Sequence, residues 1–200
     1  MESLVAFFHS IDVALFRLGN TFIANPVFDV LMPFITEEEH FIIPIFLIWF
    51  GLLIFGGKRG RIAAVVLLIA TGLADAVAAQ IIKPVVERSR PCHEMDTLRL
   101  LVNCGGRYGF VSNHAANMFA SMTVLAFFYR KIRWYLWSFA AVVAFSRVYV
   151  GVHYPGDIFF GGLFGFGMAY LFIGLLILIN NGQRKRERTW LEWREDTTVL

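Results

Sequence analysis

The chain has 200 residues, of which 58% are hydrophobic and only 16% are charged, and its formal net charge is +3. This composition excludes an ordinary soluble globular domain and indicates a membrane protein. The length suits one domain, so we expect a single membrane-embedded domain over residues 1–200.

The first 36 residues differ from the rest because polar side chains interrupt their apolar positions. Residues 4–18 form an amphipathic pattern, and Asn25 followed by Pro26 is a start signal for a short helix over 27–35. We therefore predict an N-terminal helical segment, 1–36, that lies in the outer membrane interface. A sixth membrane crossing is the alternative, and it would move the N-terminus to the inner side.

Five later stretches approach the roughly 20 apolar residues that a membrane-spanning helix needs. They show no alternating strand pattern, and backbone groups in lipid must pair internally, so we expect helices. The sequence thus predicts an all-α, polytopic transmembrane helical bundle with five clear spans. The predicted spans are 41–57, 62–82, 115–129, 132–149 and 158–179.

Basic residues give this bundle an orientation. The runs 58–61, 130–133 and 184–188 follow the first, third and fifth spans, so all three fall on one side of the membrane. The positive-inside rule makes that side the cytoplasm, and residues 180–200 a cytoplasmic tail. The loops 83–113 and 150–157 then share the outer face.

Cys92 and Cys104 lie in the longest polar stretch of the chain. We expect them to form a disulfide if their loop faces an oxidising compartment, and a pair of free thiols is the alternative. Asp75, inside the second span, is expected to bond with a serine or tyrosine of a neighbouring helix. The charges of Glu87 and Arg88 are interpreted as solvated loop charges; contact with lipid headgroups and pairing with each other are the alternatives.

Two fragments on the outer face suit an anionic group. Lys83 and Arg90 offer a point charge and a planar fork for phosphate oxygens, although basic side chains also end many membrane helices. Ser112 is a candidate N-cap for the third span, whose N-terminus forms an anion site. His114 falls in its first turn; a plain cap with an interfacial histidine is the alternative.

A third fragment joins the last two spans and carries Arg147, His153 and Asp157. The spacing of four lets the Asp157 carboxylate hold one imidazole nitrogen and leave the other free as a nucleophile. Arg147 adds a third positive charge. The three fragments share one predicted face, which indicates an active site there, with residues 83–113 as an active-site loop.

These residues resemble the type 2 phosphatidic-acid phosphatase superfamily, which includes membrane lipid phosphatases and soluble vanadium haloperoxidases. The family pattern is Lys, six residues, Arg-Pro; then Pro-Ser-Gly-His; then Ser-Arg, five residues, His, three residues, Asp. The first block is matched by Lys83, Arg90 and Pro91, and the third by Ser146, Arg147, His153 and Asp157. The middle block keeps Ser112 and His114, with Val111 and Asn113 where the family has Pro and Gly.

The resemblance implies a mechanism without a cofactor or metal. His153 would attack phosphorus, Asp157 would orient its ring, and His114 would protonate the leaving oxygen and later activate water. The residues expected to bind phosphate are Lys83, Arg90, Ser112, Asn113 through its amide, and Arg147.

The expected function is therefore hydrolysis of a membrane lipid phosphate or diphosphate, such as undecaprenyl diphosphate or phosphatidic acid, at the outer face. The alternatives are a lipid phosphotransferase that uses the same intermediate, and a non-catalytic anion-binding membrane protein or transporter. We expect a bacterial plasma membrane with the site toward the periplasm or exterior; a eukaryotic luminal site has the same pattern. The partners are the bilayer and its lipid, and no nucleic acid.

Overall fold

The computed structural model describes residues 2–184, and within this range every regular element is helical. The predicted all-α architecture is therefore confirmed. The basic tail predicted over 180–200 lies mostly outside the described residues. The helices are α1 Glu2–Arg17, η1 Leu18–Phe22, α2 Pro26–Thr36, α3 Glu39–Ile54, α4 Gly57–Val77, η2 Ala78–Ile82, α5 Lys83–Val86, α6 Pro91–Glu94, α7 Asn113–Phe128, η3 Arg130–Ile132, α8 Arg133–Tyr149 and α9 Pro155–Arg184.

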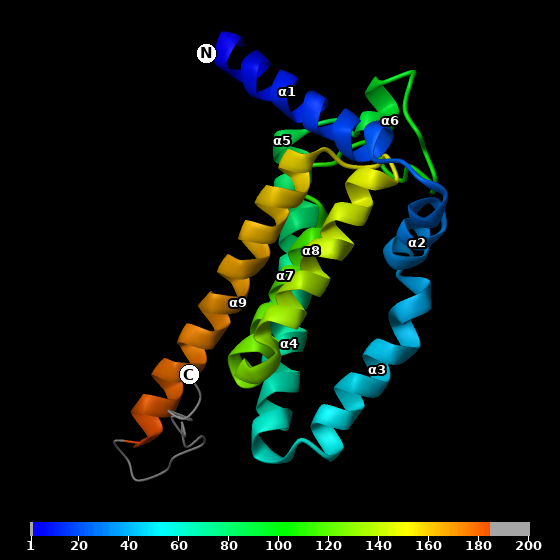
Figure 1. The fold of residues 1–200 in the computed structure, drawn as a ribbon. Coiled ribbons are helices and arrows are strands. Elements are labelled where there is room, and N and C mark those ends of the chain that lie inside the picture. Colours follow the sequence, from blue (N-terminus) through cyan, green and yellow to red (C-terminus); the bar gives the residue numbers. More distant parts are fainter. Residues whose placement is uncertain (1, 185–200) are drawn as a thin grey trace.

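The N-terminal segment folds as two helices, as the sequence predicts. The Asn25 side chain caps α2 by accepting a hydrogen bond of 3.0 Å from the Phe28 amide, and Pro26 occupies the first helical position. The axes of 6–22 and 26–36 differ by 115°. Figure 1 shows α1 lying across one end of the bundle, while α2 turns down beside α8.

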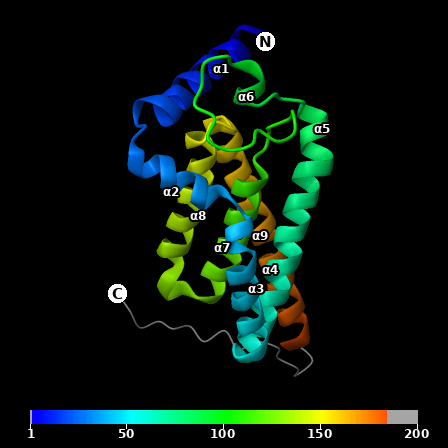
Figure 2. The ribbon, with the colours of Figure 1, turned by 90° about the vertical axis from the view of Figure 1, so that its right-hand side faces the viewer.

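α7 is the central helix of the bundle. It packs against α4, α8 and α9, whereas α3 contacts mainly α4 and has no buried residue. Figure 2 shows α7 enclosed by the other long helices. This central position explains how α7 can carry polar residues such as His114 and Asn117, because neighbouring helices surround them.

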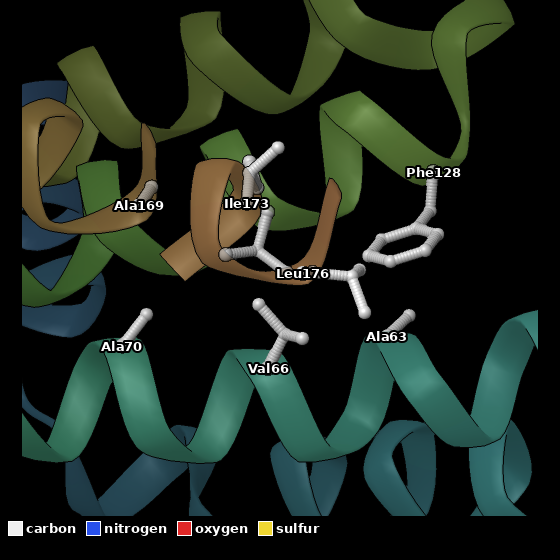
Figure 3. Close-up of a cluster of buried hydrophobic side chains, with 8 residues drawn as sticks. Ala63, Val66, Ala70, Phe128, Ala169, Ile173 and Leu176 are labelled. Carbon is white, nitrogen blue, oxygen red and sulfur yellow. The ribbon is translucent and has the colours of Figure 1, made fainter. Parts of the chain in front are cut away.

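Small side chains let these helices approach closely. Gly161, Gly165 and Ala169 recur every four residues along α9 and face α7, which is the spacing that brings membrane helices together. Next to this contact, apolar side chains of α4, α7 and α9 form a buried cluster, shown in Figure 3. Its buried members are Ala63, Val66, Ala70, Val124, Phe128, Ala169, Ile173 and Leu176.

Two helices are long and apolar enough to cross a bilayer, Gly57–Val86 and Pro155–Gln183. The bent pair of 6–22 and 26–36 makes a third candidate if it counts as one span. The other predicted spans do form helices, α3, α7 and α8, but these have only 16 or 17 residues. The five predicted crossings are therefore not confirmed, whereas the apolar surfaces support an integral membrane protein.

The connections between helices gather at two ends. The α3–α4 turn and the α7–α8 turn, which carry Lys58, Arg59, Arg130 and Lys131, lie at the lower end in Figure 1. The segments between α5 and α7 and between α8 and α9 lie at the upper end, near α1. This separation matches the expected division between a basic end and an end that carries the candidate site.

The close contact between α7 and α9 gives a stability test. A Cβ at position 165 would lie 2.2 Å from the Ala116 carbonyl oxygen, so Gly165→Ala forces the two backbones apart. We expect this variant to lose about 1–3 kcal/mol of unfolding free energy, measured by thermal unfolding in detergent. Gly167→Ala is the matched control, because no atom lies within 4 Å of its added Cβ; equal losses would contradict the packing argument.

Candidate active site

The predicted pair of His153 and Asp157 is buried where α9 begins. His153 is 1% exposed and Asp157 is fully buried. The His153 Nδ1 atom lies 3.3 Å from Asp157 Oδ2, which also accepts a hydrogen bond of 3.0 Å from the Tyr154 amide. The carboxylate thus fixes the ring through Nδ1, and Nε2 is the nitrogen that this contact leaves available.

Arg88, which the sequence analysis treated as a solvated charge, is instead part of this arrangement. Its guanidinium donates to Asp157 Oδ1 at 2.9 Å and to Asp12 of α1 at 2.5 Å. It also lies over the Tyr154 ring, 4.4 Å from the ring centroid. Asp12 accepts a further bond of 2.7 Å from the Gly156 amide. The interpretation of Arg88 was wrong because nothing near it in sequence reveals Asp12 or Asp157.

Three predicted cations surround the histidine. His153 interacts electrostatically with Arg90, Arg147 and Lys83. Arg90 is only 8% exposed and Arg147 only 9%. The Nε atoms of both arginines are buried, and neither has a hydrogen-bond partner among residues 2–184. Buried guanidinium donors need an acceptor, so this arrangement is suited to an anion with several oxygens.

The N-terminus of α7 lies beside these groups. The Ser112 side chain caps the helix by accepting from the Ala115 amide at 3.5 Å, and the Ser112 amide donates to the Asp157 carbonyl at 3.0 Å. His114 follows in the first turn and interacts electrostatically with Arg147 and His153. Helix α7 therefore begins at the predicted Ser112 cap, and its N-terminal residues contact the segment that carries Asp157.

Asn113 occupies the place where the family pattern has glycine, and its side chain turns away from the cations. Its amide donates to the Asp75 carboxylate at 2.7 Å, and Asn117 donates to the same oxygen at 2.9 Å. Asp75 thus has a structural partner, as expected, but the partner is a pair of asparagines and not serine or tyrosine. A role for Asn113 in phosphate binding is left to its backbone amide.

The polar loop that carries Arg90 is folded by pairing and by a disulfide. The Arg90 amide donates to the Arg107 carbonyl at 3.1 Å, and the Gly109 amide donates to the Arg88 carbonyl at 2.8 Å. Cys92 and Cys104 are joined by a disulfide, with their Cα atoms 6.1 Å apart. The two backbone hydrogen bonds and the disulfide join the first part of the loop, which contains Arg90, to its last part.

Gly109 is a site residue that the sequence analysis missed. A Cβ at this position would lie 3.0 Å from Arg90 Cγ, 3.1 Å from Asp157 Oδ2 and 3.5 Å from His153 Nδ1. The Gly109 backbone also interacts with the His153 ring. Its backbone therefore covers the Nδ1 side of the ring, and a side chain would push into the pair. A glycine in a polar loop gives no such signal in sequence.

The surroundings decide the protonation of His153. Burial, together with the positive charges of Arg90, Arg147 and Lys83, holds the pKa of the imidazole well below its usual value of 6.5. The neutral, nucleophilic ring is therefore the form present at neutral pH. Burial also lowers the pKa of Arg90, partly offset by Asp157.

One group of side chains among residues 2–184 has the spacing of metal ligands, namely Cys92, His93 and Cys104. The disulfide engages both of its thiols. We therefore assign no metal to this group.

Comparisons with known proteins agree with the geometry. The model of the PAP2 superfamily matches residues 62–178, a range that contains every residue of the three motif blocks. The match begins after α3, so it does not include the N-terminal helices that contact the site.

Individual relatives extend the likeness over most of the chain. A lipid A 4'-phosphatase of Bacteroides thetaiotaomicron is 30% identical, over 84% of this chain and 78% of the relative. The undecaprenyl-diphosphatase of Sulfolobus acidocaldarius is 32% identical, over 80% and 76%. The crystal structure of a transmembrane PAP2 type phosphatidylglycerolphosphate phosphatase from Bacillus subtilis has the same fold, with a TM-score of 0.67, 24% identity and coverage of 86% and 87%.

The position of Gly109 gives a test of the site. Gly109→Ala should displace Arg90 or the His153–Asp157 pair, and displacement of reacting groups by about 1 Å lowers rates by roughly 100-fold. The measurement is the rate of phosphate release from the lipid phosphate that wild type cleaves best. Gly106→Ala, in the same loop with no atom within 4 Å of its added Cβ, should keep the wild-type rate; a similar loss in both would contradict the prediction.

Proposed function

Because the chain belongs to the PAP2 superfamily, we propose that it hydrolyses a membrane lipid phosphate or diphosphate through a phosphohistidine on His153. The family match bears out the resemblance drawn from the motif blocks. The protein is an integral membrane enzyme of the lipid phosphatase type.

The observation that carries the proposal is the pair of buried, unpartnered guanidinium Nε atoms beside a buried histidine. The oxygens of a phosphate group accept hydrogen bonds from several directions, and the planar guanidinium of arginine has N–H donors that fit this geometry. Arg90, Arg147 and Lys83 supply three positive charges around His153. This charge suits the equatorial oxygens of a transferring phosphoryl group, where negative charge is spread in the transition state.

In the first step, His153 Nε2 forms a bond to phosphorus while the bond from phosphorus to the lipid oxygen breaks. Asp157 holds Nδ1 and stabilises the positive charge that develops on the ring, and Arg88 keeps the carboxylate in place. His114 gives its proton to the departing lipid oxygen, so the product leaves as an alcohol or, from a diphosphate, as a monophosphate.

In the second step, water attacks phosphorus and the bond to His153 breaks. His114, which lost its proton in the first step, takes a proton from the water and is restored. Inorganic phosphate is released and His153 returns to its neutral form. In both steps the phosphoryl oxygens are bound by Lys83, Arg90, Arg147, the Ser112 hydroxyl and the backbone amide of Asn113.

The substrate class follows from the relatives and from the apolar bundle. The proteins similar to this chain are named for lipid A and for undecaprenyl diphosphate, both membrane lipids that carry phosphate. We place the substrate of this chain in the same class, a phosphate or diphosphate on a lipid whose tail stays in the bilayer.

The site faces the outer side of the membrane in this proposal. Its loops lie at the end opposite the basic turns 58–61 and 130–133, which favour the cytoplasmic side. The Cys92–Cys104 disulfide supports the same orientation, since disulfides persist in oxidising compartments. A bacterial plasma membrane with the site toward the periplasm or exterior fits both observations.

Phosphate release from purified protein tests the mechanism. In detergent and EDTA, wild type should release phosphate from at least one member of a panel that holds lipid A, undecaprenyl diphosphate, phosphatidic acid and phosphatidylglycerol phosphate. His153→Ala should lower the rate by more than about 1,000-fold, because it removes the attacking group. His93→Ala is the matched control, since His93 is an exposed histidine of the other predicted outer loop, 83–113.

Three outcomes would count against the proposal. Activity that requires an added metal ion would reject the histidine mechanism. Activity that survives in His153→Ala would assign the chemistry elsewhere. Phosphate that appears on an added alcohol acceptor in preference to water would identify a phosphotransferase.

The low pKa of His153 predicts the pH dependence. A lowered pKa means that the neutral ring persists as pH falls, so kcat/KM should keep its plateau below pH 6.5, after correction for substrate ionisation measured by phosphorus NMR. A tenfold decline per pH unit that begins at 6.5 would show an ordinary imidazole. Arg90→Gln removes the positive neighbour with the largest effect on the His153 pKa, so it should move the acidic limb of the pH profile toward higher pH.

A further inference from the structure

Thr36, the last residue of α2, reaches the candidate site from outside the region that the family model matches. It is 2% exposed, and its hydroxyl oxygen accepts a hydrogen bond of 2.9 Å from Arg147 Nη1. The two residues lie 111 positions apart in the chain. A buried hydroxyl that accepts from a buried guanidinium is an interaction of the stronger kind, because one partner is charged.

Thr36 also contacts the other histidine of the site. The Thr36 backbone also interacts with the His114 ring. One residue therefore contacts both a predicted phosphate-binding arginine and the predicted acid-base group. The hydrogen bond of the hydroxyl is the contact that orients Arg147.

The turn after α2 keeps Thr36 in place. The Glu37 amide donates to the Pro33 carbonyl at 3.1 Å, and the His40 ring lies 3.1 Å from the Phe34 carbonyl through Nδ1. The same ring stacks on Phe34 with centroids 4.6 Å apart. These contacts close the end of α2 against the start of α3, so Thr36 is not a frayed helix end.

The hydrogen bond to Thr36 matters because it determines where the other N–H donors of Arg147 point. A guanidinium has five N–H donors in one rigid plane, so fixing Nη1 sets the direction of the remaining donors. The Arg147 Nε atom is buried and has no partner among the described residues. Without the Thr36 hydroxyl, Arg147 loses a contact that defines this plane.

We propose that Thr36 is a positioning residue of the reaction, which orients Arg147 for the phosphoryl oxygens. This inference rests on the proposed function. It makes α2 one wall of the active site, although α2 lies before the family domain in the chain.

Orthovanadate is the probe for the test, because it becomes a five-coordinate mimic of a transferring phosphoryl group when it bonds to a nucleophile. Thr36→Val keeps the shape of the side chain and removes the acceptor, so the inhibition constant for vanadate should rise about tenfold, and kcat/KM should fall to a similar degree. Thr36→Ser retains the hydroxyl and should stay within about twofold of wild type.

Thr123→Val is the matched control. Thr123 is also a buried threonine, 1% exposed, whose hydroxyl accepts a bond from an N–H group, that of Trp137 at 3.3 Å. Its loss should affect thermal stability but leave vanadate inhibition unchanged. Equal shifts in Thr36→Val and Thr123→Val, or no shift in Thr36→Val, would overturn the inference and leave Thr36 a packing residue.

Two further measurements keep the test decisive. If Thr36→Val is not recovered folded, Thr36→Ala removes the same acceptor and should raise the inhibition constant in the same way. Calorimetric binding of vanadate in an Arg147→Ala background should show no additional loss from Thr36→Ala, because the interaction under study is already gone; full additivity would overturn the inference.

The assay separates this inference from the function on which it rests. Loss of phosphate release in His153→Ala with a normal vanadate response in Thr36→Val rejects only the role of Thr36. Phosphate release that is unaffected in His153→Ala rejects the proposed function itself.

Discussion

The site depends on one buried carboxylate, Asp157, and on the groups that keep it paired. A carboxylate without solvent needs compensating charge and donors, and Arg88, the Tyr154 amide and the His153 ring supply them. Because Asp157 lies in the first turn of α9 and its carbonyl accepts a hydrogen bond from the Ser112 amide, the same residue also ties α9 to α7. The short segment around Asp157 therefore contributes both to the candidate site and to the packing of α9 against α7.

Much of this arrangement follows from sequence pattern. Apolar runs predict the positions of α3, α4, α7, α8 and α9, since each of these helices packs apolar side chains against other helices or against lipid. The Asn25 and Ser112 caps follow from local chemistry that needs only three residues. The spacing of His153 and Asp157 brings their side chains into contact, because residues four positions apart near the start of a helix lie on the same side.

Other parts could not be predicted, because they depend on approach between distant segments. The partners of Asp75 are asparagines one helix away, and those of Arg88 lie on α1 and α9. Gly109 matters only because the loop folds back over the ring. The five predicted crossings were not confirmed for a different reason: α3, α7 and α8 form as predicted but have only 16 or 17 residues, and the points where helices end depend on turns and tertiary contacts.

The long sequence separation of the contacts to α1 and α2 bears on how the enzyme is made. Asp12 and Thr36 are synthesised early, yet their partners Gly156 and Arg147 follow 144 and 111 residues later. A chain that is still being inserted therefore holds its N-terminal helices without their final contacts. Hydrolytic competence would arise only once α9 has entered the membrane, so a truncated or stalled chain remains harmless to the lipids around it.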